Sequence, residues 1–285
     1  MKFHSVARLT GATNFVHKGF SVVRSFHPII FLATFLTLSG CGSSLELSSR
    51  WTSQAPKIDG SDADWNDATA HIAGPDVLIG IKNDNDNLYM CLSTVSRTTE
   101  WQMLALGTTI WFDTEGKKNK SFGVQFPISV LAQGRRLPPD ISQMSAEDIQ
   151  RLIDLAQRQL EILGPGAGEH QRIPLNQGKG VEGHLGYADG KLTLELKVPL
   201  HKSADHPYAI NADGKVPLSI GLETGDYADA MRSRQGTGGR GTSAPAGGRG
   251  GRGGGGQAGA GLGGDAPEPL KHWLVVHIAG SAAPN

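Results

Sequence analysis

The chain has 285 residues, and its 27 basic and 27 acidic side chains give a formal net charge of zero at pH 7. This balance argues against a general affinity of the folded part for nucleic acid or for anionic membranes. The length is sufficient for a full hydrophobic core.

The first 40 residues have the pattern of a secretory signal. Four basic residues and no acidic residue are found there, and the apolar run Pro28 to Leu38 is too short for a stable membrane anchor. The string Leu38-Ser39-Gly40-Cys41 that follows resembles the lipobox of bacterial lipoproteins. An ordinary secretory signal with an accidental cysteine is the alternative, and the length of the leader leaves the true start codon open.

The lipobox resemblance implies cleavage before Cys41, acyl (palmitate-type) chains on that residue and anchoring in a bacterial cell envelope. Gly42 rather than an aspartate follows the cysteine, which implies transfer to the outer membrane. Cleavage would leave 285 − 40 = 245 residues, with 27 − 4 = 23 basic and 27 acidic side chains and a net charge of −4. Cys91 would then be the one unmodified cysteine, which excludes an intramolecular disulfide.

After Cys41 the sequence predicts a short tether over residues 41–54, because this stretch begins with small and polar residues. A single domain is expected over residues 55–280. Residues 76–84 and 87–95 alternate apolar and polar side chains on either side of the turn-forming run Asn83–Asn87, which predicts a β-hairpin.

Further strands are predicted from the same alternation at Thr109–Asp113, Ser121–Phe126, Lys191–Val198, Pro217–Leu222 and Trp273–Ile278. In Lys191–Val198 the leucines are expected to face inward, and Thr193, Glu195 and Lys197 outward. These elements predict an all-β fold, an antiparallel β-sandwich.

One segment has helical spacing. Ser145 to Leu163 repeats apolar residues at helical intervals, starts with a capping pair, Ser145 and Asp148, and ends at Gly164-Pro165. We expect this inserted helix, residues 145–163, to cover an edge or an open end of the sandwich. A lid over a ligand site is the alternative.

The segment from Gly236 to Gly264 contains 16 glycines in 29 residues. It has too few apolar side chains to offset the entropy cost of ordering, so residues 236–264 are predicted to be a disordered insertion between the last two strands. Five arginines and no acidic residue lie between Asp229 and Asp265, which would permit weak affinity for acidic polysaccharide or lipopolysaccharide.

The strongest motif after the leader is Ile58-Asp59-Gly60 with Trp65 and Ala68 behind it, and it resembles the opening of family-nine carbohydrate-binding modules. Three later strings are similar to elements of that family in the same order: DNDNLY (84–89), IWFD (110–113) and ELKVPL (195–200). The resemblance implies a sandwich fold and a carbohydrate ligand. Asp59, as a cap of the turn, and Trp65, as a buried ring, are interpreted as structural.

A sugar-binding surface needs flat aromatic rings that stack on the C–H faces of the sugar. Trp101 follows a polar stretch, and Trp111 is opposite in strand phase to Ile110 and Phe112, so these two tryptophans are the candidate ligand platform. Packing of both rings beneath the helix or loops is the alternative. The other tryptophans precede the domain, belong to its core or are expected to face inward: Trp51, Trp65 and Trp273.

The run Asn83–Asn87 has the oxygen density of a calcium loop, and relatives in the family bind structural calcium, so Asp84 and Asp86 are candidate calcium ligands. A plain hairpin turn accounts for the run equally well, and no other cofactor is expected.

The sequence contains none of the common hydrolase, metalloprotease or phosphate-binding motifs, which favours a non-catalytic protein. We therefore expect an extracytoplasmic lipoprotein with a non-catalytic, glycan-binding sandwich. An assembly lipoprotein that docks an unknown protein partner is the main alternative, and a module linked to glycoside hydrolysis is the weaker one.

Overall fold

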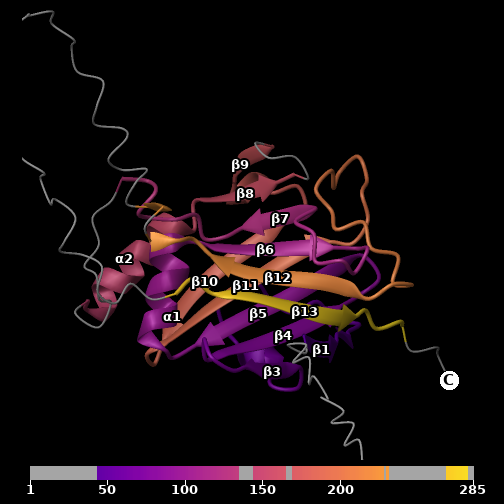
Figure 1. The fold of residues 1–285 in the computed structure, drawn as a ribbon, viewed down its shortest axis with the longest axis horizontal. Coiled ribbons are helices and arrows are strands. Elements are labelled where there is room, and N and C mark those ends of the chain that lie inside the picture. The colour runs from indigo at the N-terminus through magenta and orange to yellow at the C-terminus, as the bar shows by residue number, and fades with distance from the viewer. Residues whose placement is uncertain (1–43, 135–143, 165–168, 228, 231–267, 282–285) are drawn as a thin grey trace, which may run out of the picture. The chain divides into compact units, whose positions relative to one another are not determined.

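The computed structural model describes five parts of the chain: residues 44–134, 144–164, 169–227, 229–230 and 268–281 (Figure 1). The predicted signal peptide, Cys41 and the glycine-rich segment 236–264 lie outside the described residues. The described residues form two β-sheets with a few short helices, which confirms the predicted all-β sandwich. None of the helices in this described part is long and apolar enough to cross a membrane.

The first sheet has seven strands. Their order is β1 (Leu45–Ser48), β13 (Lys271–His277), β12 (Leu218–Thr224), β6 (Thr108–Asp113), β7 (Phe122–Gln125), β8 (Gln159–Leu163) and β9 (His170–Pro174). All neighbours are antiparallel except β1, which runs parallel to β13 with Leu45 opposite Leu274. The strands predicted near residues 109, 121, 217 and 273 are all in this sheet.

The second sheet has six strands. Their order is β10 (Glu182–Ala188), β11 (Lys191–Pro199), β5 (Asn87–Thr94), β4 (Val77–Asn83) and β2 (Arg50–Trp51), with β3 (Thr69–Ile72) also paired to β4. Strands β4 and β5 form the predicted antiparallel hairpin.

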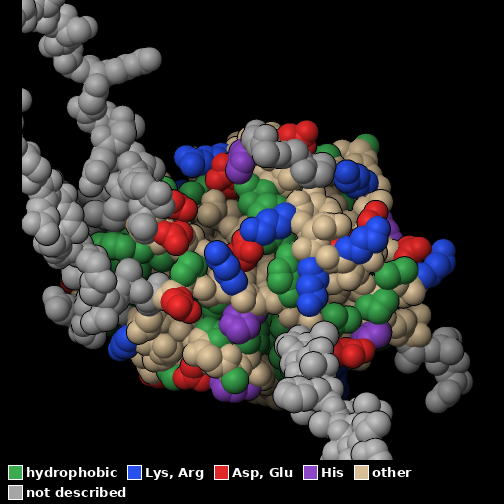
Figure 2. All heavy atoms as spheres, viewed as in Figure 1, with side chains coloured by type: hydrophobic (Ala, Val, Ile, Leu, Met, Phe, Trp, Pro, Cys, Tyr) green, Lys and Arg blue, Asp and Glu red, His purple; other side chains and the backbone are tan. Residues whose placement is uncertain are grey.

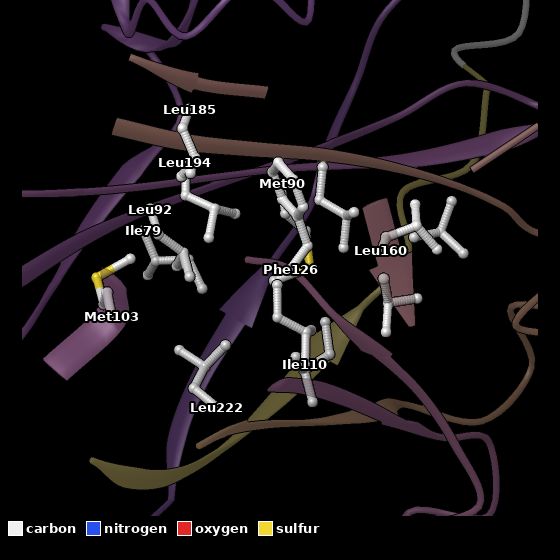
Figure 3. Close-up of a cluster of buried hydrophobic side chains, with 14 of the residues drawn as sticks. Ile79, Met90, Leu92, Met103, Ile110, Phe126, Leu160, Leu185, Leu194 and Leu222 are labelled. Carbon is white, nitrogen blue, oxygen red and sulfur yellow. The ribbon is translucent and has the colours of Figure 1, made fainter. Parts of the chain in front are cut away.

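The core lies between the two sheets. Met90, Leu92 and Leu194 come from the six-stranded sheet, and Ile110 and Leu222 come from the seven-stranded sheet; these side chains point toward one another in Figure 3. All five are at most 3% exposed. Complete burial of one such side chain contributes about 1.5–3 kcal/mol, so the interface between the sheets is the main source of stability.

The segment predicted as one long helix contains two elements. Helix α2 (Ala146–Ala156) starts with the predicted capping box, in which Ser145 and Asp148 bond reciprocally. It ends at Ala156, and Gln159–Leu163 is strand β8, so the prediction of helix through Leu163 is wrong. The physical reason is non-local: β8 pairs with β7 on one side and with β9 on the other, which satisfies its backbone groups better than an added helical turn.

Helix α2 covers one end of the sandwich, as expected. Its apolar face is buried in the core and packs against β10. Figure 1 shows α2 at the same end as α1 (Arg97–Trp101), which continues directly into the short π-helix η2 (Gln102–Leu106). The sequence did not reveal these two elements, because such short helices have no measurable periodicity.

The predicted tether, residues 41–54, is largely part of the fold. Leu45–Ser48 and Arg50–Trp51 are strands in different sheets. Between them the buried Ser49 hydroxyl donates to Oδ1 of Asn83 at 2.5 Å. The prediction of a tether beyond Ser44 is therefore wrong. These strands are only four and two residues long, which is too short for an alternation signal.

Glu195 was expected on the solvent side of β11 but is fully buried, because the segment around the Ile58-Asp59-Gly60 turn covers that side. Its Oε2 accepts the backbone N–H groups of Asp59 at 2.8 Å and Gly60 at 2.6 Å. Its Oε1 accepts the indole N–H of Trp65 at 2.7 Å. Burial raises the pKa of Glu195, and the three donors act against this rise.

Trp65 is buried, as predicted, but outside the main core. Its ring lies against Gly80 on the outer side of β4, in a small cluster with Tyr89 and Cys91. A Cβ atom on Gly80 would come within 2.6 Å of Cε3 of Trp65, so only glycine permits this approach. Asp59 caps the turn as predicted, because its Oδ1 accepts the N–H of Ser61 at 3.0 Å.

We predict that Glu195→Gln lowers the free energy of unfolding by about 1–3 kcal/mol, because an amide N–H₂ would replace one acceptor oxygen. When the amide N–H₂ faces the indole N–H of Trp65, two donors meet and neither has an acceptor. In a Trp65→Phe background the indole donor is absent, so Glu195→Gln should lower the free energy of unfolding by less. Urea denaturation of the double-mutant cycle measures this difference. The matched control is Glu182→Gln, whose side chain is 54% exposed on the adjacent strand. Strictly additive effects would contradict the assigned bond.

Candidate functional site

Trp101, one of the two predicted platform residues, is only 5% exposed and belongs to the core. It ends helix α1, and its ring centroid lies 5.8 Å from that of Tyr227. The polar residues before it form the helix, which begins at the cap Ser96 and turns Trp101 inward. The prediction that Trp101 is exposed for ligand binding is therefore wrong.

Trp111, the other predicted platform residue, lies on the outer side of β6 and is half-buried. Its neighbours Ile110 and Phe112 are in the core, so the predicted strand phase is confirmed. The indole N–H donates to Oε2 of Glu223 on β12 at 3.2 Å. Nζ of Lys120 bonds to the same oxygen at 2.6 Å and lies 5.5 Å from the Trp111 ring centroid.

Trp273 was expected to face inward, but its side chain is on the outer side of β13 and is half-buried. Leu274 and Val276 are the residues of β13 that enter the core. The sequence did not show which residues of β13 face the core, because Trp273 to Val276 are four consecutive apolar residues. Trp273 is the site residue that the sequence analysis missed.

The two half-buried tryptophans alternate with glycines across the outer side of the seven-stranded sheet. Trp273 is paired with Gly221, Gly221 with Trp111, and Trp111 with Gly123. A Cβ atom on Gly123 would lie 2.7 Å from Cε3 of Trp111, and one on Gly221 would lie 3.0 Å from Cη2 of Trp273. Each ring therefore rests on the backbone of a glycine and turns its opposite face away from the sheet.

We call this arrangement the tryptophan face and define it by Trp111, Trp273, Gly123, Gly221 and Glu223. The two rings are on strands separated by one strand, and the backbones of those two strands are about 9–10 Å apart. Strands β6, β7, β12 and β13 lie side by side in Figure 1. The face offers two flat apolar surfaces with a carboxylate, which is 17% exposed, close by.

A groove of about 400 Å³ lies near the β7–β8–β9 edge of the same sheet. It is lined in part by Phe122, Gln171, Lys202 and Tyr208. The Tyr208 hydroxyl donates to Oε1 of Gln171 at 2.8 Å, so the proton of this hydroxyl is already used in a bond within the protein. The groove can admit a small molecule, and none of its lining residues is a tryptophan.

Asp84, a predicted calcium ligand, is engaged in the β4–β5 turn. Its Oδ1 accepts the N–H groups of Asp86 and Asn87 at 2.8 and 2.7 Å, and its Oδ2 accepts the hydroxyl of Tyr89 at 2.6 Å. Across the part of the chain that the structure covers, no three His, Cys, Asp or Glu side chains are grouped to hold a metal ion. These bonds are those of a plain hairpin turn, which was the alternative to a calcium loop. Calcium binding at Asp84 and Asp86 stays a prediction.

The fold and this face define a β-sandwich domain with an exposed aromatic surface. Among solved structures, the chain is similar to a family-nine carbohydrate-binding module from Caldicellulosiruptor kristjanssonii in complex with cellotriose, at 9% identity and a TM-score of 0.31 over 65% of this chain and 79% of that one. A candidate carbohydrate-binding protein from Bacteroides uniformis matches at 9% identity and a TM-score of 0.35, over 65% of this chain and 85% of that one. No family model and no curated protein matches the chain.

We predict that Trp101→Ala lowers the free energy of unfolding by about 3–5 kcal/mol, since it empties a core position. Trp111→Ala and Trp273→Ala should each cost roughly half of that or less, because part of each ring is already in water. Thermal and urea denaturation of the three variants measure the difference. Equal losses for all three would show that the rings of the tryptophan face are core residues.

Proposed function

We propose that this protein is a membrane-anchored, non-catalytic lipoprotein that binds a glycan on the tryptophan face. The observation that carries the proposal is the pair of tryptophan rings, each resting on a cross-strand glycine on the outer side of one sheet. Flat aromatic surfaces that turn one face away from the protein can stack on the C–H faces of pyranose rings.

The spacing of the rings fits an extended saccharide. The rings are on alternate strands whose backbones are about 9–10 Å apart, so a ligand that contacts both rings must contain more than one sugar unit. Glu223 lies beside Trp111 and accepts its indole N–H at 3.2 Å, which fixes the orientation of the ring. Because rigid strands hold both rings, little side-chain entropy is lost when a ligand binds.

The interior carboxylates support a binding rather than a hydrolytic role. Glu100 is fully buried, and one of its two carboxylate oxygens, Oε2, pairs with Arg97 at 2.8 Å. Asp113 is 1% exposed and accepts backbone N–H groups of the following loop, and Glu195 holds the Asp59-Gly60 turn. All three side chains therefore have structural partners, whereas a retaining or inverting glycosidase needs two carboxyl groups that face a bound substrate.

We predict that Trp111→Ala and Trp273→Ala each weaken glycan binding roughly tenfold or more, because each removes a central aromatic contact. Affinity electrophoresis in gels that contain soluble polysaccharides measures the change. Trp51→Ala is the matched control, since Trp51 is also half-buried but lies on β2 of the other sheet. It should leave glycan binding unchanged.

A second variant tests the geometry while both rings remain. Gly123→Val would place side-chain carbons where the Trp111 ring lies, so the ring must tilt away from the sheet. Glycan affinity should then fall as it does for Trp111→Ala. Absence of wild-type affinity for any glycan, together with capture of one protein partner through Trp111 and Trp273, would replace this proposal with the docking role.

The anchor at Cys41 is part of the proposal and is supported by the lipobox-like string before it. We predict that Cys41→Ser abolishes acylation and moves the protein from the membrane fraction to the soluble fraction, because no acyl chain remains to insert. Metabolic labelling with a fatty acid and membrane fractionation measure both effects. Full retention in the membrane with no label in the wild type would contradict the assignment.

A further inference from the structure

We infer that the glycan bound on the tryptophan face is acidic, with carboxylate or sulfate groups along its chain. The inference rests on the proposed function and adds the chemical class of the ligand. Three lysines, Lys118, Lys120 and Lys271, carry it.

Lys120 is the lysine closest to a stacking ring. Its side chain is 51% exposed, and Nζ lies 5.5 Å from the centroid of Trp111. Nζ also bonds to Glu223 at 2.6 Å, which neutralises the carboxylate beside the ring. The remaining ammonium protons can therefore donate to an anionic group above Trp111.

The loop that carries Lys120 has a fixed backbone. Asp113, at the end of β6, accepts the N–H groups of Glu115 at 2.9 Å, Lys117 at 2.8 Å and Asn119 at 2.8 Å. One buried carboxylate thus positions the whole loop that contains Lys118 and Lys120. This pre-organisation lowers the entropy cost of presenting their charges to a ligand.

Lys271 supplies charge on the other side of the face. It is exposed on β13, two residues before Trp273, and its cross-strand partner is Glu223. Successive odd-numbered residues of a strand lie on one side of the sheet, so Lys271 shares the side of Trp273. Lys271 and Lys120 are therefore on opposite sides of Glu223, near the two rings.

Lys118 extends the basic region toward β1, because its Nζ donates to the hydroxyl of Ser44 at 2.5 Å. Two described carboxylates lie on the same side of the sheet as these three lysines: Glu223, and Glu46 on β1, which is opposite Val275 and bonds to Nε2 of His277 at 2.6 Å. Lysines therefore outnumber carboxylates among these residues. The excess is local, since the whole chain has equal numbers of basic and acidic residues. Figure 2 shows basic side chains gathered near the middle of the side that it presents.

This arrangement fits an anionic saccharide better than a neutral one. A neutral glycan can stack on the two rings, but it offers no anionic group to the lysine ammonium groups, which stay in water. A polyuronate or sulfated glycan can stack its sugar rings on Trp111 and Trp273 while its anionic groups meet Lys120 and Lys271. Charge complementarity at a partly exposed site adds modest affinity and marked selectivity.

The test compares the affinity of the full chain, purified in detergent, for polygalacturonate, for hydroxyethylcellulose and for polyglutamate. We expect the wild type to bind polygalacturonate at least about tenfold more tightly than the other two polymers, with an affinity that falls as salt is raised. Lys120→Gln combined with Lys271→Gln should reduce the ratio of acidic to neutral glycan affinity by roughly tenfold, about two- to fivefold from each lysine.

The control is Lys57→Gln combined with Lys179→Gln, two exposed lysines outside the loop and β13 that should leave the ratio unchanged. Lys271→Gln alone tests the effect of charge by itself, because it leaves the bond between Lys120 and Glu223 in place. Equal binding of neutral and acidic glycans with no lysine effect would overturn the inference and leave the proposed function standing. Equal binding of polyglutamate would overturn it as well, because charge alone would then suffice. No binding of either glycan would overturn the proposed function itself.

Discussion

A tryptophan ring laid against a glycine of a strand is the constraint on which this structure depends. It occurs at Trp65 over Gly80, Trp111 over Gly123 and Trp273 over Gly221. In each case the missing side chain of the glycine allows the ring to contact the backbone of a strand, and a Cβ atom would lie 2.6–3.0 Å from the ring. The same packing has two outcomes: at Trp65 the N-terminal segment covers the ring and makes a second small core, whereas the other two rings stay partly in water.

The cover over Trp65 depends on Glu195, which links two of the strings that resemble the carbohydrate-binding family. The carboxylate accepts backbone N–H groups from the Asp59-Gly60 turn and the indole N–H of Trp65. The motifs are therefore parts of one hydrogen-bonded unit, although 130 residues separate Trp65 from Glu195. Their physical role is to close one side of the six-stranded sheet.

Elements whose apolar pattern is local could be predicted from the sequence. The β4–β5 hairpin, β6 and β11 alternate clearly, and the start of α2 has its own capping pair, so all were anticipated. Elements that depend on distant partners could not be. β8 has helical spacing but forms a strand because β7 and β9 flank it, and β1 is recognisable only beside β13. The site shows the same limit: the phase of Trp111 follows from Ile110 and Phe112, but its pairing with Gly221 and Gly123 requires the strand register.

The parallel pairing of β1 with β13 also bears on how the domain folds. The first strand of the seven-stranded sheet finds its partner in the last, with Leu45 opposite Leu274, so this edge cannot form until nearly the whole chain has been synthesised. Contacts of such sequence separation slow folding, while the length of the intervening insertions adds little, because the entropy of loop closure grows only logarithmically. Until β13 arrives, β12 is the open edge of the sheet, and an unpaired edge is where chains associate wrongly. Arrival of β13 therefore does two things at once, because it covers the edge of β12 and provides the partner for β1.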